Sequence, residues 1–312
     1  MTLSLTRHTT HLNWNAIAQP KGNDWRQLCL DNRTNSDMFF DVDIVDLNEI
    51  LGGSFKDTDG RQAVYDATEN RIIAVHGAQY SLIKNEYAYN MVNRAINELG
   101  AKGVIDVTDM HIKDACVNKG GKAIRQYIFP NHKLNFDGDE IMMRIVVINS
   151  YDGSANFSLQ VGGFRVVCLN GLISGKSFMN LNKRHSGVIN LANLERQIIT
   201  ATKSFNQLGE LWRQMISTPI SQAQSDAIWA DFATDKGAER PSLQKYGMMC
   251  DLFDNHAKTL GRNYWAAYNT LTAWSTHYEV QDRNVENKAD VILKRETKVS
   301  SIINNKKLWM PA

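Results

Sequence analysis

The 312-residue chain has little of what marks a membrane-bound, secreted or disulfide-stabilised protein. It has no run of about 18 consecutive apolar residues, the length that a transmembrane helix requires. Residues 1–8 lack the apolar core of a secretory signal peptide. The four cysteines are far apart and form no C-x-x-C pair, so we expect free thiols in a reducing cytoplasm: Cys29, Cys116, Cys168 and Cys250.

The chain as a whole also has no large excess of positive or negative charge. The formal net charge is only +2, which excludes a strongly polybasic binder of the histone kind. The charges are nevertheless segregated, because residues 1–112 sum to −5, residues 113–196 to +5 and residues 197–312 to +2. The sequence therefore predicts a local positive field in the middle of the chain.

Motifs for enzymatic or metal chemistry are incomplete. Residues 171–177 (Gly-Leu-Ile-Ser-Gly-Lys-Ser) have three residues between the first Gly and the Gly-Lys-Ser, whereas a phosphate-binding loop needs four. The eight histidines are scattered, and His8 and His11 lack a nearby carboxylate or thiol, so no metal site is expected. The carboxylate pair Asp41 and Asp43 is typical of an exposed strand face. We expect a protein that is not an enzyme and needs no cofactor.

Hydrophobic periodicity predicts an α+β fold, with a mainly antiparallel sheet over about residues 35–190 and a helical region after it. We expect residues 1–190 to form a β-rich core with one helix, and residues 191–312 to pack on or beside the sheet. Strands are predicted at 39–45, 63–65, 71–75, 80–83, 104–117, 123–129, 141–148, 157–161 and 164–169. Glycines mark turns at 52–53, 120–121 and 162–163.

Capping residues and three- to four-residue apolar spacing predict the helices. One spans about 86–99, capped by Asn85 and ended by Gly100. After residue 190 we expect a long helix capped by Asn190, a short one from Thr218 or Ser221, and one starting at Ser242. Two more are predicted over about 264–278 and 286–303.

The basic middle block is the candidate binding site. Its cations alternate with aromatic residues, a pattern that suits a phosphate backbone with stacked bases. Aromatics on strands are also typical core residues, and lysines on hairpins also protect sheet edges, so the pattern alone leaves this alternative open. The residues assigned to nucleic-acid binding are Lys119, Lys122, Arg125, Tyr127, Lys133, Arg144, Arg165, Lys176, Phe178, Lys183 and Arg184. A second basic segment covers residues 283–312, with seven cations and three carboxylates.

Several short motifs, in the right order, resemble the phage/plasmid-like proteins, a family of unknown function. Residues 80–87 (Tyr-Ser-Leu-Ile-Lys-Asn-Glu-Tyr) are similar to its strand-to-helix passage. Residues 149–154 and 164–172 resemble its "Ser-x-Asp-Gly-Ser" turn and "Arg-Val-Val-Cys-Gln-Asn" strand. Arg184-His185-Ser186 resembles its "Arg-His-Thr", and the segment from Tyr264 to His277 its C-terminal "Trp-x-x-x-Asn-x-x-Thr" helix. Lys84 and Leu169 depart from the pattern, and residues 1–70 show no resemblance.

The resemblance implies a bacteriophage or mobile-element origin and hence a host cytoplasm. The chain is also similar to single-stranded-DNA-binding RNA polymerase cofactors of lytic podophages. We therefore expect a non-enzymatic phage protein that binds single-stranded DNA without strong sequence preference and assists transcription or replication. Two alternatives stay open: a single-strand annealing protein, and a protein that binds a phage or host RNA polymerase but no nucleic acid. A membrane partner is not expected, and a homo-oligomer stays open.

Overall fold

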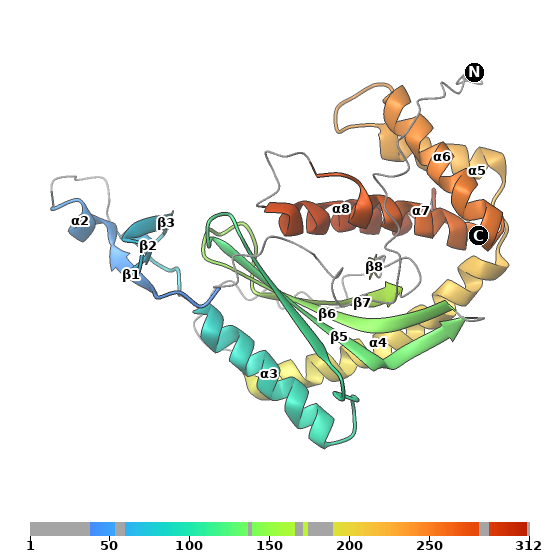
Figure 1. Cartoon of the computed structure of the whole chain (residues 1–312). Coiled ribbons are helices and arrows are strands. Elements are labelled where there is room, and N and C mark those ends of the chain that lie inside the picture. The colour runs from blue at the N-terminus through green and yellow to red at the C-terminus, as the bar shows by residue number, and fades with distance from the viewer. Residues whose placement is uncertain are drawn as a thin grey trace.

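The computed structural model of the chain describes residues 38–53, 60–136, 139–165, 171–173, 190–280 and 287–310. The expected α+β class is confirmed: two antiparallel sheets form in the N-terminal half, and long helices form the C-terminal half (Figure 1). Within the described residues, no helix is both long and apolar enough to cross a membrane.

The smaller sheet has three strands in the order β1-β2-β3: β1 (Val42–Asp46), β2 (Gln62–Asp66) and β3 (Arg71–His76). The short helix α2 (Leu47–Ile50) follows β1, and Asp46 caps it by accepting a hydrogen bond from the backbone N–H of Asn48. These elements lie to one side of the rest of the molecule in Figure 1. The strands predicted at 63–65 and 71–75 are confirmed as β2 and β3, which pair with each other as a hairpin.

The larger sheet has five strands in sequence order, each antiparallel to its neighbours. They are β4 (His111–Val117), β5 (Lys122–Phe136), β6 (Asp139–Ser150), β7 (Ser158–Arg165) and β8 (Gly171–Ile173). The turn between β4 and β5 is in the predicted place, but its positive φ angles are at Asn118, Lys119 and Gly120 and not at Gly121. Most of β6 is buried on both sides, which explains its almost continuous apolar sequence.

Three strand predictions are wrong. Residues 80–83 form no strand and lead directly into α3 (Asn85–Ala101). Residues 104–110 form bends and a turn instead of a strand, so β4 is only the second half of the predicted strand. Gly162 and Gly163 lie inside β7, opposite Arg144 and Met143 of β6, and form no turn.

The helical half agrees closely with the sequence analysis. The helices are α4 (Leu191–Ser217), α5 (Gln222–Ala233), α6 (Leu243–Leu260), α7 (Tyr264–His277) and α8 (Lys288–Ile303). Asn190, Ser221 and Ser242 cap α4, α5 and α6 as predicted. The exception is α3, where Lys84 is the N-cap and Asn85 is instead a buried helical residue that donates to the Met38 carbonyl.

The five-stranded sheet lies between two layers of helices. Alternate residues of β5 and β6 pack with α3 to α7 in one large core, which includes Phe205, Trp212, Trp229 and Tyr268. The opposite face carries a smaller core in which Ile124, Val146 and Ile148 meet Ala289 and Ile292 of α8. Figure 1 shows α3 and α4 on one side of the sheet and α8 on the other.

Tyr151, the residue directly after β6, links the small sheet to this body. Its hydroxyl accepts a hydrogen bond from the Asn85 N–H at 2.7 Å, at the start of α3. Its carbonyl lies 2.7 Å from Nε2 of His76 in β3, and its ring packs with Val42 and Val64. The inner face of the small sheet is therefore covered by the body.

Candidate functional site

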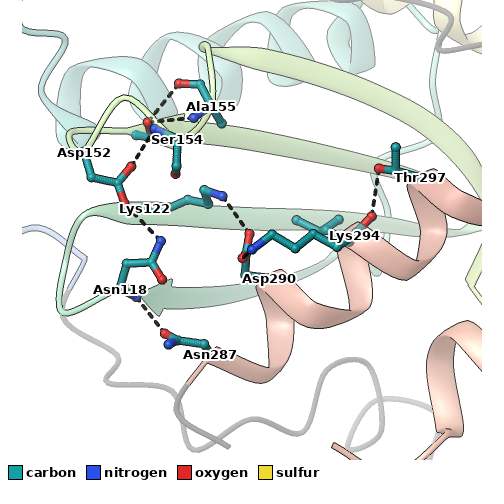
Figure 2. A network of polar contacts seen from close by, with 11 residues as sticks. Asn118, Lys122, Asp152, Ser154, Ala155, Asn287, Asp290, Lys294 and Thr297 are labelled. Carbon is teal, nitrogen blue, oxygen red and sulfur yellow. Dashed lines mark hydrogen bonds and ion pairs between the residues drawn. The ribbon is translucent and has the colours of Figure 1, made fainter. Parts of the chain in front are cut away.

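The face of the large sheet that meets α8 holds two of the predicted nucleic-acid contacts. Lys122 Nζ lies 2.6 Å from Asp290 Oδ1, and Arg144 lies 2.9 Å from Glu296 Oε1. All four side chains are almost completely buried. Lys294, one helical turn after Asp290, makes a second ion pair with it at 2.6 Å (Figure 2). The assignment of Lys122 and Arg144 to nucleic-acid binding is corrected, because their charges are already neutralised between the sheet and α8.

Figure 2 shows how the contacts continue along this interface. Asn287, beside the N-terminus of α8, accepts a hydrogen bond from the backbone N–H of Asn118 at 2.8 Å. The Asn118 side chain donates to Asp152 at 2.9 Å, in the turn that follows β6. The network therefore joins α8 to two hairpin turns of the sheet.

Asp290 is the carboxylate on which two cations converge. Burial alone would raise its pKa, but the hydrogen bonds from Lys122 and Lys294 outweigh burial and hold the pKa below its ordinary value. The group therefore stays ionised, and together the three charges carry a net +1. Only Lys294 presents its ammonium to solvent, with 75% of the side chain exposed.

Arg125 and Tyr127 lie on the other face of the sheet, against α3. Arg125 makes a two-bond ion pair with Asp114, both distances being 2.6 Å, and its guanidinium stacks 5.0 Å from the Tyr89 ring centroid. Tyr127 is fully buried and donates its hydroxyl proton to Asn93. Their assignment is corrected as well, because an interior ring cannot stack on a base and this guanidinium already has its carboxylate.

Arg165 ends β7 and is buried where α4 and α7 meet the sheet. It lies 2.5 Å from Asp139, donates to the Asn269 side chain at 3.1 Å, and faces the Trp265 ring. Burial raises the pKa of Asp139, and Arg165 opposes that shift. Burial also lowers the pKa of the neighbouring His256 to about 4, with further lowering by Arg165. Arg165 is therefore an interior residue and not a surface phosphate contact, which corrects this assignment too.

Two predicted contacts do reach the surface. Lys119 is exposed at the tip of the β4–β5 turn, and Lys133 on β5 is exposed but lies 2.5 Å from Glu140. The remaining four lie outside the described residues: Lys176, Phe178, Lys183 and Arg184. The predicted residues therefore do not form one exposed basic surface within the described part of the chain.

The outer side of α8 and the segment after it form a different basic surface. Residues 287–310 contain six cations and two carboxylates, and both carboxylates, Asp290 and Glu296, point into the sheet. The cations are exposed or partly exposed: Lys288, Lys294, Arg295, Lys298, Lys306 and Lys307. Since a 16-residue helix is about 24 Å long, these cations follow an extended stripe. We call this the α8 stripe.

An aromatic side chain adjoins the α8 stripe. Tyr278 is 37% exposed, and the Arg295 guanidinium lies 5.3 Å from its ring centroid. Arg295 also donates to the carbonyls of Tyr278 and Glu279, which fixes the guanidinium against the ring. Lys298 lies deeper: burial, then Lys245, lowers its pKa, while Asp235 opposes the shift. The stripe thus combines cations that are exposed or partly exposed with one exposed ring.

Sequence reasoning identified the basic C-terminal segment but did not assign it as the binding site, and it did not single out Tyr278. The spacing of Asp290 and Lys294 at i and i+4 was the available signal, since it predicts an ion pair on one helix face. Which side of α8 meets the sheet could not be read from the spacing alone. In the described residues, no group of three or more His, Cys, Asp or Glu side chains could hold a metal ion.

Comparison with protein families gives one extended match, to a domain of unknown function, DUF932, over residues 73–309. The chain belongs to this family. Among curated proteins it is similar to the UPF0380 proteins YfjQ and YafZ of Escherichia coli (strain K12), each 42% identical over 43 residues. That segment is 14% of this chain and 16% of each relative. No solved structure matches.

Proposed function

We propose that this protein of the DUF932 family binds single-stranded nucleic acid through the α8 stripe, without strong sequence preference. The observation that carries the proposal is the polarity of α8, which buries Asp290 and Glu296 but leaves Lys294 exposed and its other cations partly exposed. Exposed cations attract phosphates, and binding releases the counterions that surround the nucleic acid. An unpaired base can also stack on the exposed ring of Tyr278.

The biological setting is part of the same proposal. The resemblance to phage/plasmid-like proteins favours a bacteriophage or mobile-element protein in a host cytoplasm, where it would hold a single-stranded template for transcription or replication. A phage or host RNA polymerase is the partner that such a role requires. No catalytic group is invoked, because binding alone exposes the template.

The test is fluorescence anisotropy of a labelled 20-nucleotide oligo-dT with the full chain at 50 and 200 mM salt. Replacing Lys294, Lys306 and Lys307 by Glu should lower the affinity at least tenfold and flatten the salt dependence, because phosphate contacts are lost. The matched control replaces three exposed lysines elsewhere by Glu: Lys203, Lys236 and Lys258. It should lower the affinity less than threefold.

Two results contradict the proposal. Absence of binding at 50 mM salt rejects nucleic-acid binding altogether. Equal losses in the two triple variants would show that net charge decides the affinity, and would remove the α8 stripe as the site. Tyr278→Ala sharpens the result, because it should weaken binding to oligo-dT more than to a duplex of the same length, whose bases are already stacked.

A further inference from the structure

The outer face of the three-stranded sheet is mostly apolar, and within the described residues part of it is exposed to solvent. Cross-strand pairing places Tyr65 beside Ile72, and Ala63 between Val45 and Val75. Ile72 is 45% exposed and Val75 41%. Since the inner face already packs against the body, both faces of this sheet are apolar and only one of them is buried.

A hollow of about 460 Å³ lies on this outer face, between the strands and α2. Val45, Tyr65 and Ile72 line it from the strands, and Glu49 and Ile50 line it from α2. Ile50 is 42% exposed, so the rim is apolar as well as the floor. The hollow is open to solvent, which suits aliphatic side chains anchored from a protein segment better than an enclosed small molecule.

Carboxylates outnumber cations around this apolar face, because residues 38–53 and 60–76 hold six carboxylates and two cations, Arg61 and Arg71. Asp43, Asp46 and Glu49 are exposed, and none of the three forms an ion pair within the described residues. Arg71, the cation at the hollow, is already held by Asp66 at 3.0 Å and Glu69 at 3.2 Å. The surface therefore offers apolar contact and net negative charge together.

We propose that the outer face of β1–β3, with α2, docks a segment of another protein in which aliphatic side chains alternate with Lys or Arg. The aliphatic groups would occupy the hollow and cover Ile72 and Val75, while the cations would meet Asp43 and Glu49. Charge complementarity would set the encounter rate and the orientation, and the apolar contact would supply the affinity. A nucleic acid is excluded as the occupant by the sign of the charge.

The docking surface is separate from the α8 stripe in both residues and ligand, so the two proposals fail independently. The probe is a fluorescein-labelled peptide of eight residues that alternates lysine and valine. Two companion peptides replace all lysines by glutamate or all valines by serine. Anisotropy with the full chain should show binding of the first peptide and at least tenfold weaker binding of both companions.

Two surface variants locate the site. Asp43→Lys combined with Glu49→Lys should lower the affinity for the lysine–valine peptide at least tenfold, and Ile72→Ser combined with Val75→Ser should do the same at unchanged net charge. The matched control is Glu239→Lys combined with Asp231→Lys, two exposed carboxylates on and after α5. It should change the affinity less than threefold. Circular dichroism would check that every variant is folded.

Three outcomes overturn the proposal. Absence of binding to the lysine–valine peptide removes the assigned chemistry, and equal losses in the control remove the assigned place. Self-association of the full chain in light scattering, abolished by the Ile72 and Val75 changes, would show that a second copy covers this face. The proposal is supported if the lysine–valine peptide binds, both surface variants lower its affinity, and the control variant does not.

Discussion

The sheet–α8 interface and the small sheet use the same residue types in opposite ways. At the interface, Asp290 and Glu296 are buried and each is held by a cation of the sheet. On the small sheet, Asp43 and Glu49 face solvent beside exposed aliphatic side chains. Charges that are buried in pairs keep the fold in one arrangement, whereas exposed charges beside apolar surface are free to meet a partner.

The family match follows the same division. It begins at residue 73, so β1, α2 and β2 precede it, while the five-stranded sheet and all the long helices fall within it. The ion pairs of the body therefore belong to the shared part of the chain. The proposed docking surface is built mainly from residues outside that part.

Loss of a buried carboxylate gives the largest expected contrast between the two regions. Glu296→Ala should lower the free energy of unfolding by about 3–5 kcal/mol, because the Arg144 guanidinium would stay buried without its carboxylate. Glu49→Ala should change it by less than about 0.5 kcal/mol, since this carboxylate is exposed. Urea unfolding at pH 7 measures both.

A double replacement separates lost charge pairing from lost packing. Arg144→Met combined with Glu296→Leu removes both charges and should be much less destabilising than Glu296→Ala alone. If the double variant were as unstable as the single one, the ion pair would not be the cause. If Glu49→Ala were equally harmful, the contrast between the two regions would fail.

Tyr151 joins the two regions, and its hydroxyl gives the next largest effect. Tyr151→Phe keeps the packing of the ring with Val42 and Val64 but leaves the buried N–H of Asn85 without its acceptor. The free energy of unfolding should fall by about 1–2 kcal/mol. Hydrogen exchange should show faster exchange at Asn85 and β3, with β6 and β7 unchanged. Equally faster exchange throughout the five-stranded sheet and its helices would contradict a local role of the Tyr151 hydroxyl.

The periodicity and capping signals predicted most of the fold because they are local. Asn190, Ser221 and Ser242 start their helices as expected, and the long apolar run of β6 forms a strand. Gly162 and Gly163 were predicted as a turn because glycine occurs both in turns and inside strands. Their place in β7 depends on pairing with β6, which is a non-local contact.

The site was harder to predict for a similar reason. Lys122, Arg125, Arg144 and Arg165 have the spacing of surface cations, yet each meets a carboxylate that the fold brings to it. Asp290 and Glu296 lie more than 150 residues along the chain from their partners. No local sequence pattern indicates a pair of residues so far apart. The sum of charges in the middle block therefore predicted a positive surface on the sheet and not on α8.

The smallest expected difference between the two regions is in how the free energy of unfolding changes at acid pH. Since the pKa of Asp290 lies below its unfolded value, its ion pairs stabilise the fold fully above the ordinary aspartate range near pH ~3.9. That contribution is lost as the pH falls through the lower, folded-state pKa. Asp290→Asn removes the titrating group, so the free energy of unfolding should fall less steeply between pH 5 and pH 2 than in the unaltered chain.

Asp43→Asn is the matched control, because it removes one exposed carboxylate that has no described ion pair. It controls for the loss of one carboxylate by itself, and urea unfolding at each pH is measured for the unaltered chain and both variants. If the free energy of unfolding of Asp290→Asn fell with pH as steeply as that of the unaltered chain, Lys122 and Lys294 would not be lowering the pKa of this carboxylate. The buried network would then stabilise the fold by packing alone. The paired carboxylates at α8 and the unpaired ones on the small sheet would not differ in their electrostatic contribution to stability.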